Sequence, residues 1–185
     1  MKGLYIHIPF CIKKCKYCDF ISFSGCKEYF KQYIKELKKE MLKYEGEKID
    51  TIFIGGGTPT ILDTDSILKL SKDIFNIFDI EKNAEFTIEA NPKTLSEEKL
   101  EAMLKSNINR LSIGVQSFNN NELLALGRMH NAYEAEEAVI LAKKAGFSNI
   151  NIDTKHKNNI GRNHKCPSPI IILYATPHEN SKLEL

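Results

Sequence analysis

The sequence predicts an α/β fold, a partial (β/α) barrel that is incomplete at its C-terminal side. Short apolar runs typical of strands occupy residues 4–8, 51–54, 86–90, 111–115 and 150–153, and helical segments separate them. Runs that are apolar on both faces and alternate with helices are typical of a parallel sheet built from βα units. The alternation continues without the change of pattern expected at a second domain, which favours a barrel over a doubly wound sheet.

The segments between the apolar runs carry helical periodicity and helix-end signals. In residues 28–44, apolar side chains fall on one helical face: Phe30, Ile34, Leu37 and Met41. A second helix follows residue 62, with Asp63 or Asp65 as its N-cap and an apolar face of Ile67, Leu70, Ile74 and Phe78. Further helices are expected over residues 96–106, 120–126 and 132–145, the last of them ended by Gly146.

The composition is that of one ordinary globular domain. The chain has 185 residues, of which 42% are hydrophobic and 27% charged. A formal charge of +2 is too small to indicate a nucleic-acid partner or a membrane surface. We expect no transmembrane segment, because no apolar run approaches ~18 residues, and no secretory signal. Three of the five cysteines fall within eight residues, which indicates metal binding in a reducing compartment and a cytoplasmic protein.

The cysteine motif CxxxCxxC follows the first apolar run directly. Cys11, Cys15 and Cys18 offer three soft thiolate ligands on one loop, which suits zinc or an iron–sulfur cluster. With three ligands, a [4Fe–4S] cluster would keep one iron open to an added ligand. A structural zinc site is the alternative, and because zinc takes four ligands, Cys26 or His7 would have to complete it.

Other distinctive residues stand at the C-terminal ends of the expected strands, where (β/α) barrels carry their functional side chains. The glycine-rich segment 55–59 follows the second strand and could let the backbone approach a ligand whose polar atoms its N–H groups bind. Glu89 and Asp153 could bind ribose hydroxyls, Gln116 a nucleoside or carboxylate, and Arg128 a carboxylate. Each of these residues is also compatible with an ordinary turn, capping or surface role.

Read in order, the segments YIHIPFC, CKYCDF, FIGGGTPT, TIEANP, LSIGVQSF, LGRMH and NID resemble one known family. They are similar to the oxygen-independent coproporphyrinogen III oxidase-like branch of the radical S-adenosylmethionine (SAM) superfamily, from about Gly3 to Asp153. The resemblance implies a [4Fe–4S] cluster on the three cysteines, SAM on its open iron, and a reductant such as flavodoxin or ferredoxin. It also implies SAM contacts from Tyr5, Gly56, Gly57, Thr58, Glu89, Gln116, Arg128 and Asp153.

Two functions compete within that branch. The coproporphyrinogen oxidase pattern has a further cysteine two places after the third, where this chain has Phe20. The sequence therefore resembles the heme chaperone (HemW) subfamily, which implies heme binding and delivery to acceptor proteins. Oxidative decarboxylation of coproporphyrinogen is the alternative, and a non-catalytic, zinc-knotted remnant is a third. His7 and His130 are conceivable heme ligands, although a structural hydrogen-bonding role is favoured for both.

The resemblance breaks after Asp153. We interpret residues 1–153 as the partial barrel and residues 154–185 as an irregular tail, so that the chain resembles a truncated or disrupted and non-functional copy. Residues 155–167 are polar and lack periodicity, which predicts early proteolysis there. The apolar run 170–174 is expected to add an edge strand beside the fifth strand, which lacks a partner.

Overall fold

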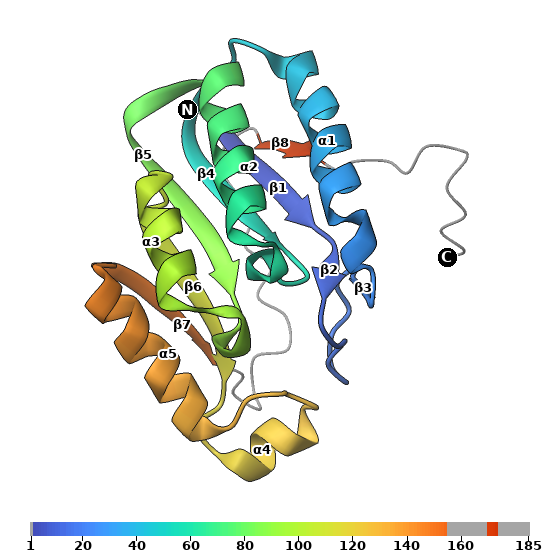
Figure 1. Cartoon of the computed structure of the whole chain (residues 1–185), viewed down its shortest axis with the longest axis vertical. Helices are drawn as coiled ribbons and strands as arrows, with labels where there is room; N and C mark the ends of the chain where they lie inside the picture. Colours follow the sequence, from blue (N-terminus) through green and yellow to red (C-terminus); the bar gives the residue numbers. More distant parts are fainter. Residues whose placement is uncertain (1, 155–169, 174–185) are drawn as a thin grey trace.

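The computed structural model describes residues 2–154 and 170–173. Its centre is a six-stranded sheet in the order β7-β6-β5-β4-β1-β8, in which every neighbouring pair is parallel (Figure 1). The strands are β1 (Gly3–Ile8), β4 (Lys48–Gly56), β5 (Asp79–Ala90), β6 (Arg110–Gln116), β7 (Asn149–Thr154) and β8 (Ile170–Leu173). A separate parallel pair, β2 (Phe10–Cys11) and β3 (Phe23–Ser24), brackets the cysteine loop.

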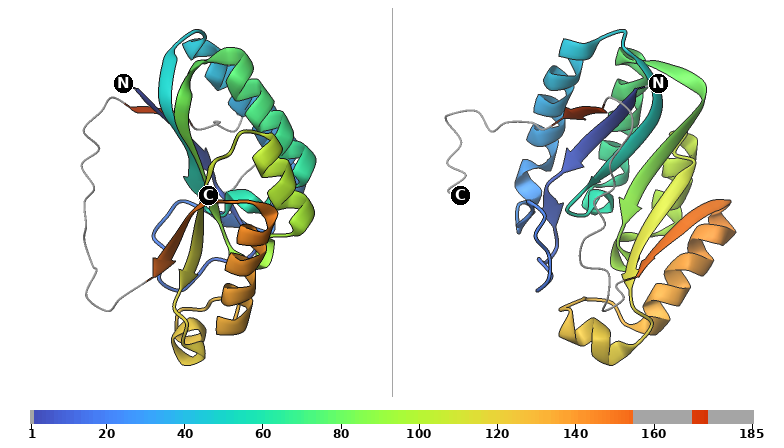
Figure 2. Two further views of the ribbon diagram at one scale, coloured as in Figure 1. Left: turned by 90° about the vertical axis from the view of Figure 1, so that its left-hand side faces the viewer. Right: turned by 180° about the vertical axis from the view of Figure 1, so that it is seen from behind.

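Helices cover one face of this curved sheet, as the edge-on view of Figure 2 shows. They are α1 (Phe30–Met41), α2 (Thr64–Ile77), α3 (Glu97–Lys105) and α5 (Ala132–Ala145), while α4 (Asn120–Ala125) lies at the C-terminal end of β6. Four 3₁₀ turns complete the described elements: η1 (Lys27–Tyr29), η2 (Leu42–Tyr44), η3 (Pro59–Ile61) and η4 (Pro92–Thr94). The parallel α/β fold confirms the predicted class. Among the described residues, no helix combines the length and apolarity needed to cross a bilayer.

The predicted helix ends are largely right. Asp63 rather than Asp65 caps α2, and its carboxylate accepts a hydrogen bond of 2.8 Å from the backbone N–H of Ser66. Gly146 ends α5 with a φ of 114°, in the left-handed region that glycine adopts without strain. Strand β5 is longer than predicted, since it begins at Asp79 within a polar stretch that has no recognisable strand pattern.

The strands are not apolar on both faces, so that part of the sequence interpretation is wrong. In β5, Phe86 and Ile88 are buried in the core with the helices, while Glu85 and Glu89 alternate with them on the opposite face. The same alternation runs through β6, where Leu111 joins the core. In β5 and β6, as described, the apolar layer is on the helix-covered face and polar side chains alternate on the other face.

The last apolar run forms the predicted edge strand, but at the other edge of the sheet. Strand β8 pairs with β1, from Gly3 opposite Ile170 to Ile6 opposite Leu173, and not with β7. The reason is burial, because Leu173 enters the core beside α1 with no exposed surface, whereas Ile152 on β7 is 39% exposed. The protease-sensitive segment 155–167 lies outside the described residues.

Candidate functional site

The predicted site residues converge on one pocket at the C-terminal ends of the strands. Its volume is about 140 Å³, and its walls include all three motif cysteines. The predicted SAM contacts in the walls are Gly57, Thr58, Glu89, Gln116, Arg128 and Asp153. Tyr5 and Gly56 do not line it. Segments that are more than 100 residues apart in sequence thus meet in one place, which is the arrangement that the strand-end pattern predicts.

The three cysteines form part of the pocket wall. Cys11 ends β2 and is buried, with its sulfur 3.6 Å from the hydroxyl oxygen of Thr58. Cys15 and Cys18 are half-buried and share a tight turn, in which the N–H of Cys18 donates to the carbonyl of Cys15. Within residues 2–154 and 170–173, no three His, Cys, Asp or Glu side chains converge as ligands of one metal ion. Because all three thiols border the same pocket and thiolates are soft ligands, the donor set fits an iron–sulfur cluster.

Neither candidate for a fourth zinc ligand belongs to this pocket. Both ring nitrogens of His7 have partners, Nδ1 with the Tyr5 hydroxyl at 3.1 Å and Nε2 with the Ile21 carbonyl at 3.0 Å. The thiol of Cys26 donates to the carbonyl of Ser24 at 3.5 Å. Cys26 packs against the apolar core instead of lining the pocket. The described geometry therefore gives the zinc-knot alternative no support.

The glycine-rich segment packs against the cysteine loop itself. A Cβ at Gly57 would stand 2.6 Å from the Phe10 carbonyl oxygen and 2.9 Å from the Cys11 sulfur, so a side chain there would displace the loop. The backbone N–H of Gly57 donates to Ile8 at 2.9 Å, and that of Thr58 donates to Phe10 at 2.7 Å. The N–H groups of Gly57 and Thr58 are thus committed to β1 and β2, and their role is to join β4 to the cysteine loop.

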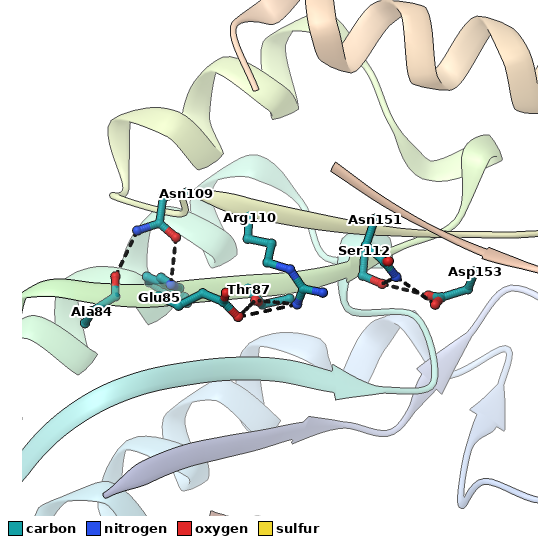
Figure 3. A network of polar contacts seen from close by, with 9 residues as sticks. Ala84, Glu85, Thr87, Asn109, Arg110, Ser112, Asn151 and Asp153 are labelled. Carbon is teal, nitrogen blue, oxygen red and sulfur yellow. Dashed lines mark hydrogen bonds and ion pairs between the residues drawn. The ribbon is translucent and has the colours of Figure 1, made fainter. Parts of the chain in front are cut away.

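Two acids flank the other side of the pocket. Burial raises the pKa of Glu89 to about 7, although the Gly56 N–H that donates to it at 3.1 Å favours the charged form and Asp153 raises the pKa further. Asp153 accepts hydrogen bonds from the Ser112 hydroxyl at 2.7 Å and the Asn151 amide at 2.8 Å (Figure 3). One acid is therefore close to half-protonated at neutral pH, while the other is oriented by its neighbours.

Gln116 and Arg128 close the pocket from β6 and the segment after α4. Gln116 has a φ of 73° at a register shift between β6 and β7, and such an irregularity re-aims a side chain. The Arg128 guanidinium donates to the Gly114 carbonyl at 2.5 Å, to the Cys15 sulfur at 3.4 Å and to the Tyr17 hydroxyl at 3.4 Å. Arg128 therefore contacts the cysteine loop and also lines the pocket.

The two histidines that could have been heme ligands have structural roles. His130 is 3% exposed, and its Nε2 hydrogen-bonds the Val115 carbonyl at 2.9 Å. His7 and Tyr5 bond each other, and Tyr5 also stacks on Phe53. This outcome agrees with the favoured interpretation of both histidines. Tyr5 stands apart from the pocket walls, so its assignment as a SAM contact stays a prediction.

Sequence reasoning missed several wall residues. Ser112 and Gly114 line the pocket because they alternate with Leu111 and Ile113 along β6, so the period of two would have found them. Lys13, Ala90 and Asn91 also line it; Ala90 and Asn91 stand at a predicted strand end, in the TIEANP segment, but were not assigned to the site. Phe20, which replaces the oxidase cysteine, lies in the wall and is 65% exposed.

Comparisons with known proteins support the family that the motifs indicate. Residues 5–160 match the model of the Radical SAM superfamily. The chain is similar to the heme chaperone HemW of Haemophilus influenzae, at 41% identity over 163 residues that cover 83% of this chain and 43% of that protein. It is also similar to HemW of Buchnera aphidicola subsp. Schizaphis graminum, at 46% identity over 82% of this chain and 41% of that protein. The chain thus spans less than half the length of these relatives.

A solved structure shows the same arrangement of elements. The coproporphyrinogen III oxidase HemN of Escherichia coli, described as a radical SAM enzyme, superposes with a TM-score of 0.76 at 30% identity. The superposition covers 83% of this chain and 36% of that one. The structure of native anSMEcpe with bound AdoMet has a TM-score of 0.53 at 17% identity, which shows a shared fold alone. The parallel α/β sheet, the three-cysteine loop and the match over most of its length show that this chain belongs to the radical SAM superfamily.

Proposed function

We propose that this chain is a heme chaperone of the radical SAM type, which holds a [4Fe–4S] cluster on Cys11, Cys15 and Cys18 and binds SAM beside it. It would act in the cytoplasm, with flavodoxin or ferredoxin as reductant, and would pass heme to an acceptor protein. The observation that carries the proposal is the convergence of the three thiols with Glu89, Arg128 and the other strand-end residues on one pocket. The similarity to heme chaperones supports the heme part.

The pocket offers SAM a complementary set of groups. The N–H groups of Gly57 and Thr58 are used within the fold, so the amino group of SAM, itself a donor, would meet backbone carbonyls of this segment. The Arg128 guanidinium would take the carboxylate, because its planar fork suits that group. A cluster bound on the thiolates would supply the electron that cleaves SAM.

The acids would hold the ribose. With a pKa of about 7, Glu89 can donate or accept a hydrogen bond to a hydroxyl at neutral pH. Asp153 is fixed by Ser112 and Asn151, so its carboxylate is oriented before a ligand arrives. These residues would position the nucleoside half of SAM, while the cysteine side of the pocket would position its methionine half.

The presence of Phe20 in place of a cysteine favours the chaperone function over the oxidase function. An exposed aromatic side chain at the wall of the pocket suits contact with a flat macrocycle such as heme and provides no thiolate. Radical decarboxylation of coproporphyrinogen remains a second candidate, favoured by the similarity to the HemN structure. We expect no protoporphyrinogen above a no-enzyme control when protein, SAM and reductant are combined, and its formation would favour the oxidase.

Anaerobic reconstitution tests the cluster. We expect about four irons and matching sulfide per chain, with broad absorption near 400 nm, because the motif provides three cluster thiolates. Cys15→Ala should abolish this absorption, while Cys26→Ala, the matched control outside the pocket, should keep it. Stoichiometric zinc in place of iron, or loss of the cluster in Cys26→Ala, would contradict the proposal. Heme titration of the same sample tests heme binding separately. Transfer of the bound heme to an apo-acceptor protein then tests delivery.

A further inference from the structure

Residues 126–130, the segment between α4 and α5, make close contacts with the middle of the cysteine loop. The carbonyl of Leu126 accepts a hydrogen bond of 3.2 Å from the backbone N–H of Lys16. The Arg128 guanidinium donates to the Cys15 sulfur and to the Tyr17 hydroxyl, both at 3.4 Å. Three consecutive loop residues are thus held by one segment that lies 110 or more positions further along the chain.

The cysteine loop needs such support because its middle has no regular secondary structure. Its two ends are held by the pairing of β2 with β3, by the bond from the Thr58 N–H to the Phe10 carbonyl, and by the contact of His7 Nε2 with the Ile21 carbonyl. Between those ends lie several exposed side chains, Lys13 and Lys14 among them. Positions 15–17 in the middle of the loop are held by hydrogen bonds to segment 126–130.

Segment 126–130 is itself fixed to the sheet. His130 is buried and hydrogen-bonds the Val115 carbonyl of β6 at 2.9 Å, and Arg128 donates to the neighbouring Gly114 carbonyl at 2.5 Å. The backbone N–H of Arg128 also returns to the Leu123 carbonyl of α4 at 2.9 Å. The segment therefore links the cysteine loop to β6 and can fix the position of the loop relative to the sheet.

Gly127 permits the close approach. Its φ of 71° lies in the left-handed region, and a Cβ there would stand 3.2 Å from Cγ and 3.5 Å from the backbone nitrogen of Lys16. Gly46 has a φ of 80° and nothing within 4 Å of the corresponding Cβ position. The two glycines therefore share the backbone constraint, but only Gly127 lies against the cysteine loop.

We propose that residues 126–130 are a clamp that holds Cys15 toward the pocket before any cofactor is present, with Gly127 and His130 as positioning residues. The link to cluster loading rests on the proposed function, because it requires the cysteines to be cluster ligands. The clamp itself is a property of the metal-free chain. It gives the segment a role toward the protein's own loop in addition to the role of Arg128 toward SAM.

The test measures cysteine alkylation in the metal-free, reduced full chain, by mass spectrometry of Cys15 and Cys26 in the same sample. Gly127→Ala and His130→Leu should raise the ratio of the Cys15 rate to the Cys26 rate at least fivefold, because the loop is released while Cys26 keeps its packing. Gly46→Ala should keep the ratio within twofold of the parent chain. In His130→Gln the amide can still donate to the Val115 carbonyl. The ratio for this variant should therefore be close to that of the parent chain.

The ratio makes each outcome decisive. A variant that unfolds is recognised because the absolute Cys26 rate rises together with the Cys15 rate; if His130→Leu unfolds, the milder Gly127→Ala decides. Equal ratios in Gly127→Ala and Gly46→Ala would overturn the clamp. Because no iron is added, this result is independent of cluster reconstitution, so a chain that fails to bind iron can still have a clamp. Trypsin cleavage after Lys16 in the same variants gives a second readout and should accelerate with the ratio.

Discussion

The two faces of the parallel sheet differ in what they contribute to this protein. The face toward the helices buries side chains such as Ile88, Leu111 and Ile113 in the apolar core. The opposite face carries Glu85, Arg110 and Ser112 along the same two strands. Arg110 donates a hydrogen bond to Glu85, and Ser112 hydrogen-bonds residues of β7 (Figure 3). Successive residues of one strand therefore belong to different environments. The fold depends on one of them, and the candidate chemistry is built on the other.

The difference shows that, among the described residues, β5 and β6 carry polar side chains rather than an apolar layer on the inner face. In a complete, closed (β/α) barrel, bulky branched side chains fill the inside in layers. Here Arg110 donates to Glu85 at 3.4 Å and to Thr87 at 3.1 Å, so charged and hydroxyl groups occupy that side. Such groups keep hydrogen-bonding capacity where an apolar layer would have none. A polar inner face suits ligand binding and contributes less to stability than the helix-covered face.

The largest expected effect concerns the helix-covered face. Ile88→Ala removes a fully buried side chain from the centre of the core, and the free energy of unfolding should fall by about 2–5 kcal/mol, from lost transfer energy and a residual cavity. Glu85→Ala, three positions earlier on the exposed inner face, should change it by about 0.5 kcal/mol or less. Urea denaturation measures both. Similar losses in the two variants would show that the faces do not divide in this way.

A smaller effect is expected at the hydrogen-bonded part of the inner face. Ser112 donates to Asp153 at 2.7 Å and accepts from Asn151 at 3.1 Å, so Ser112→Ala should lower the free energy of unfolding by about 1 kcal/mol. The variant should also weaken SAM binding, measured by calorimetry, because Asp153 loses an orienting partner. Ser148→Ala, at an exposed position, is the matched control. Unchanged SAM affinity in Ser112→Ala would show that the orientation of Asp153 by Ser112 does not contribute to SAM binding.

Much of the fold follows from the sequence because its signals are local. The helical spacing of Phe30, Ile34 and Leu37 reflects burial against the sheet, and the cap at Asp63 reflects a single hydrogen bond. The polar start of β5 and the position of β8 could not be predicted in the same way. Both depend on strands that are distant in sequence, namely the pairing of Asp79 with Lys48 and of Ile170 with Gly3.

The candidate site was predictable where residue type and strand end coincide. Cys11, Cys15, Glu89 and Asp153 combine a chemically distinctive side chain with a place after an apolar run, and they meet in one pocket. The clamp at Gly127 could not be predicted, because the contact is made by the backbone N–H of Lys16, which any non-proline residue at that position would have. Contacts made by backbone atoms are visible only in three dimensions.

The last expected effect is a pH dependence at Glu89. Burial raises the pKa of this carboxyl from its ordinary 4.5 to about 7, so the folded chain retains a proton that the unfolded chain releases. Its contribution to stability is therefore complete below pH 4.5 and declines as the pH rises toward 7. Glu89→Gln does not titrate and keeps an oxygen for the Gly56 N–H. The free energy of unfolding of this variant, relative to the parent chain, should be higher at pH 8 than at pH 5.

Glu85→Gln is the control for this measurement, because it removes an exposed acid on the same face of the same strand. Urea denaturation of the metal-free chains at pH 5 and pH 8 should show a pH-dependent difference for Glu89→Gln and little for Glu85→Gln. If the difference for Glu89→Gln were the same at both pH values, Glu89 would titrate like a solvated acid. The polar face would then be open to water at this position, and a protonated Glu89 would have no part in binding the ribose.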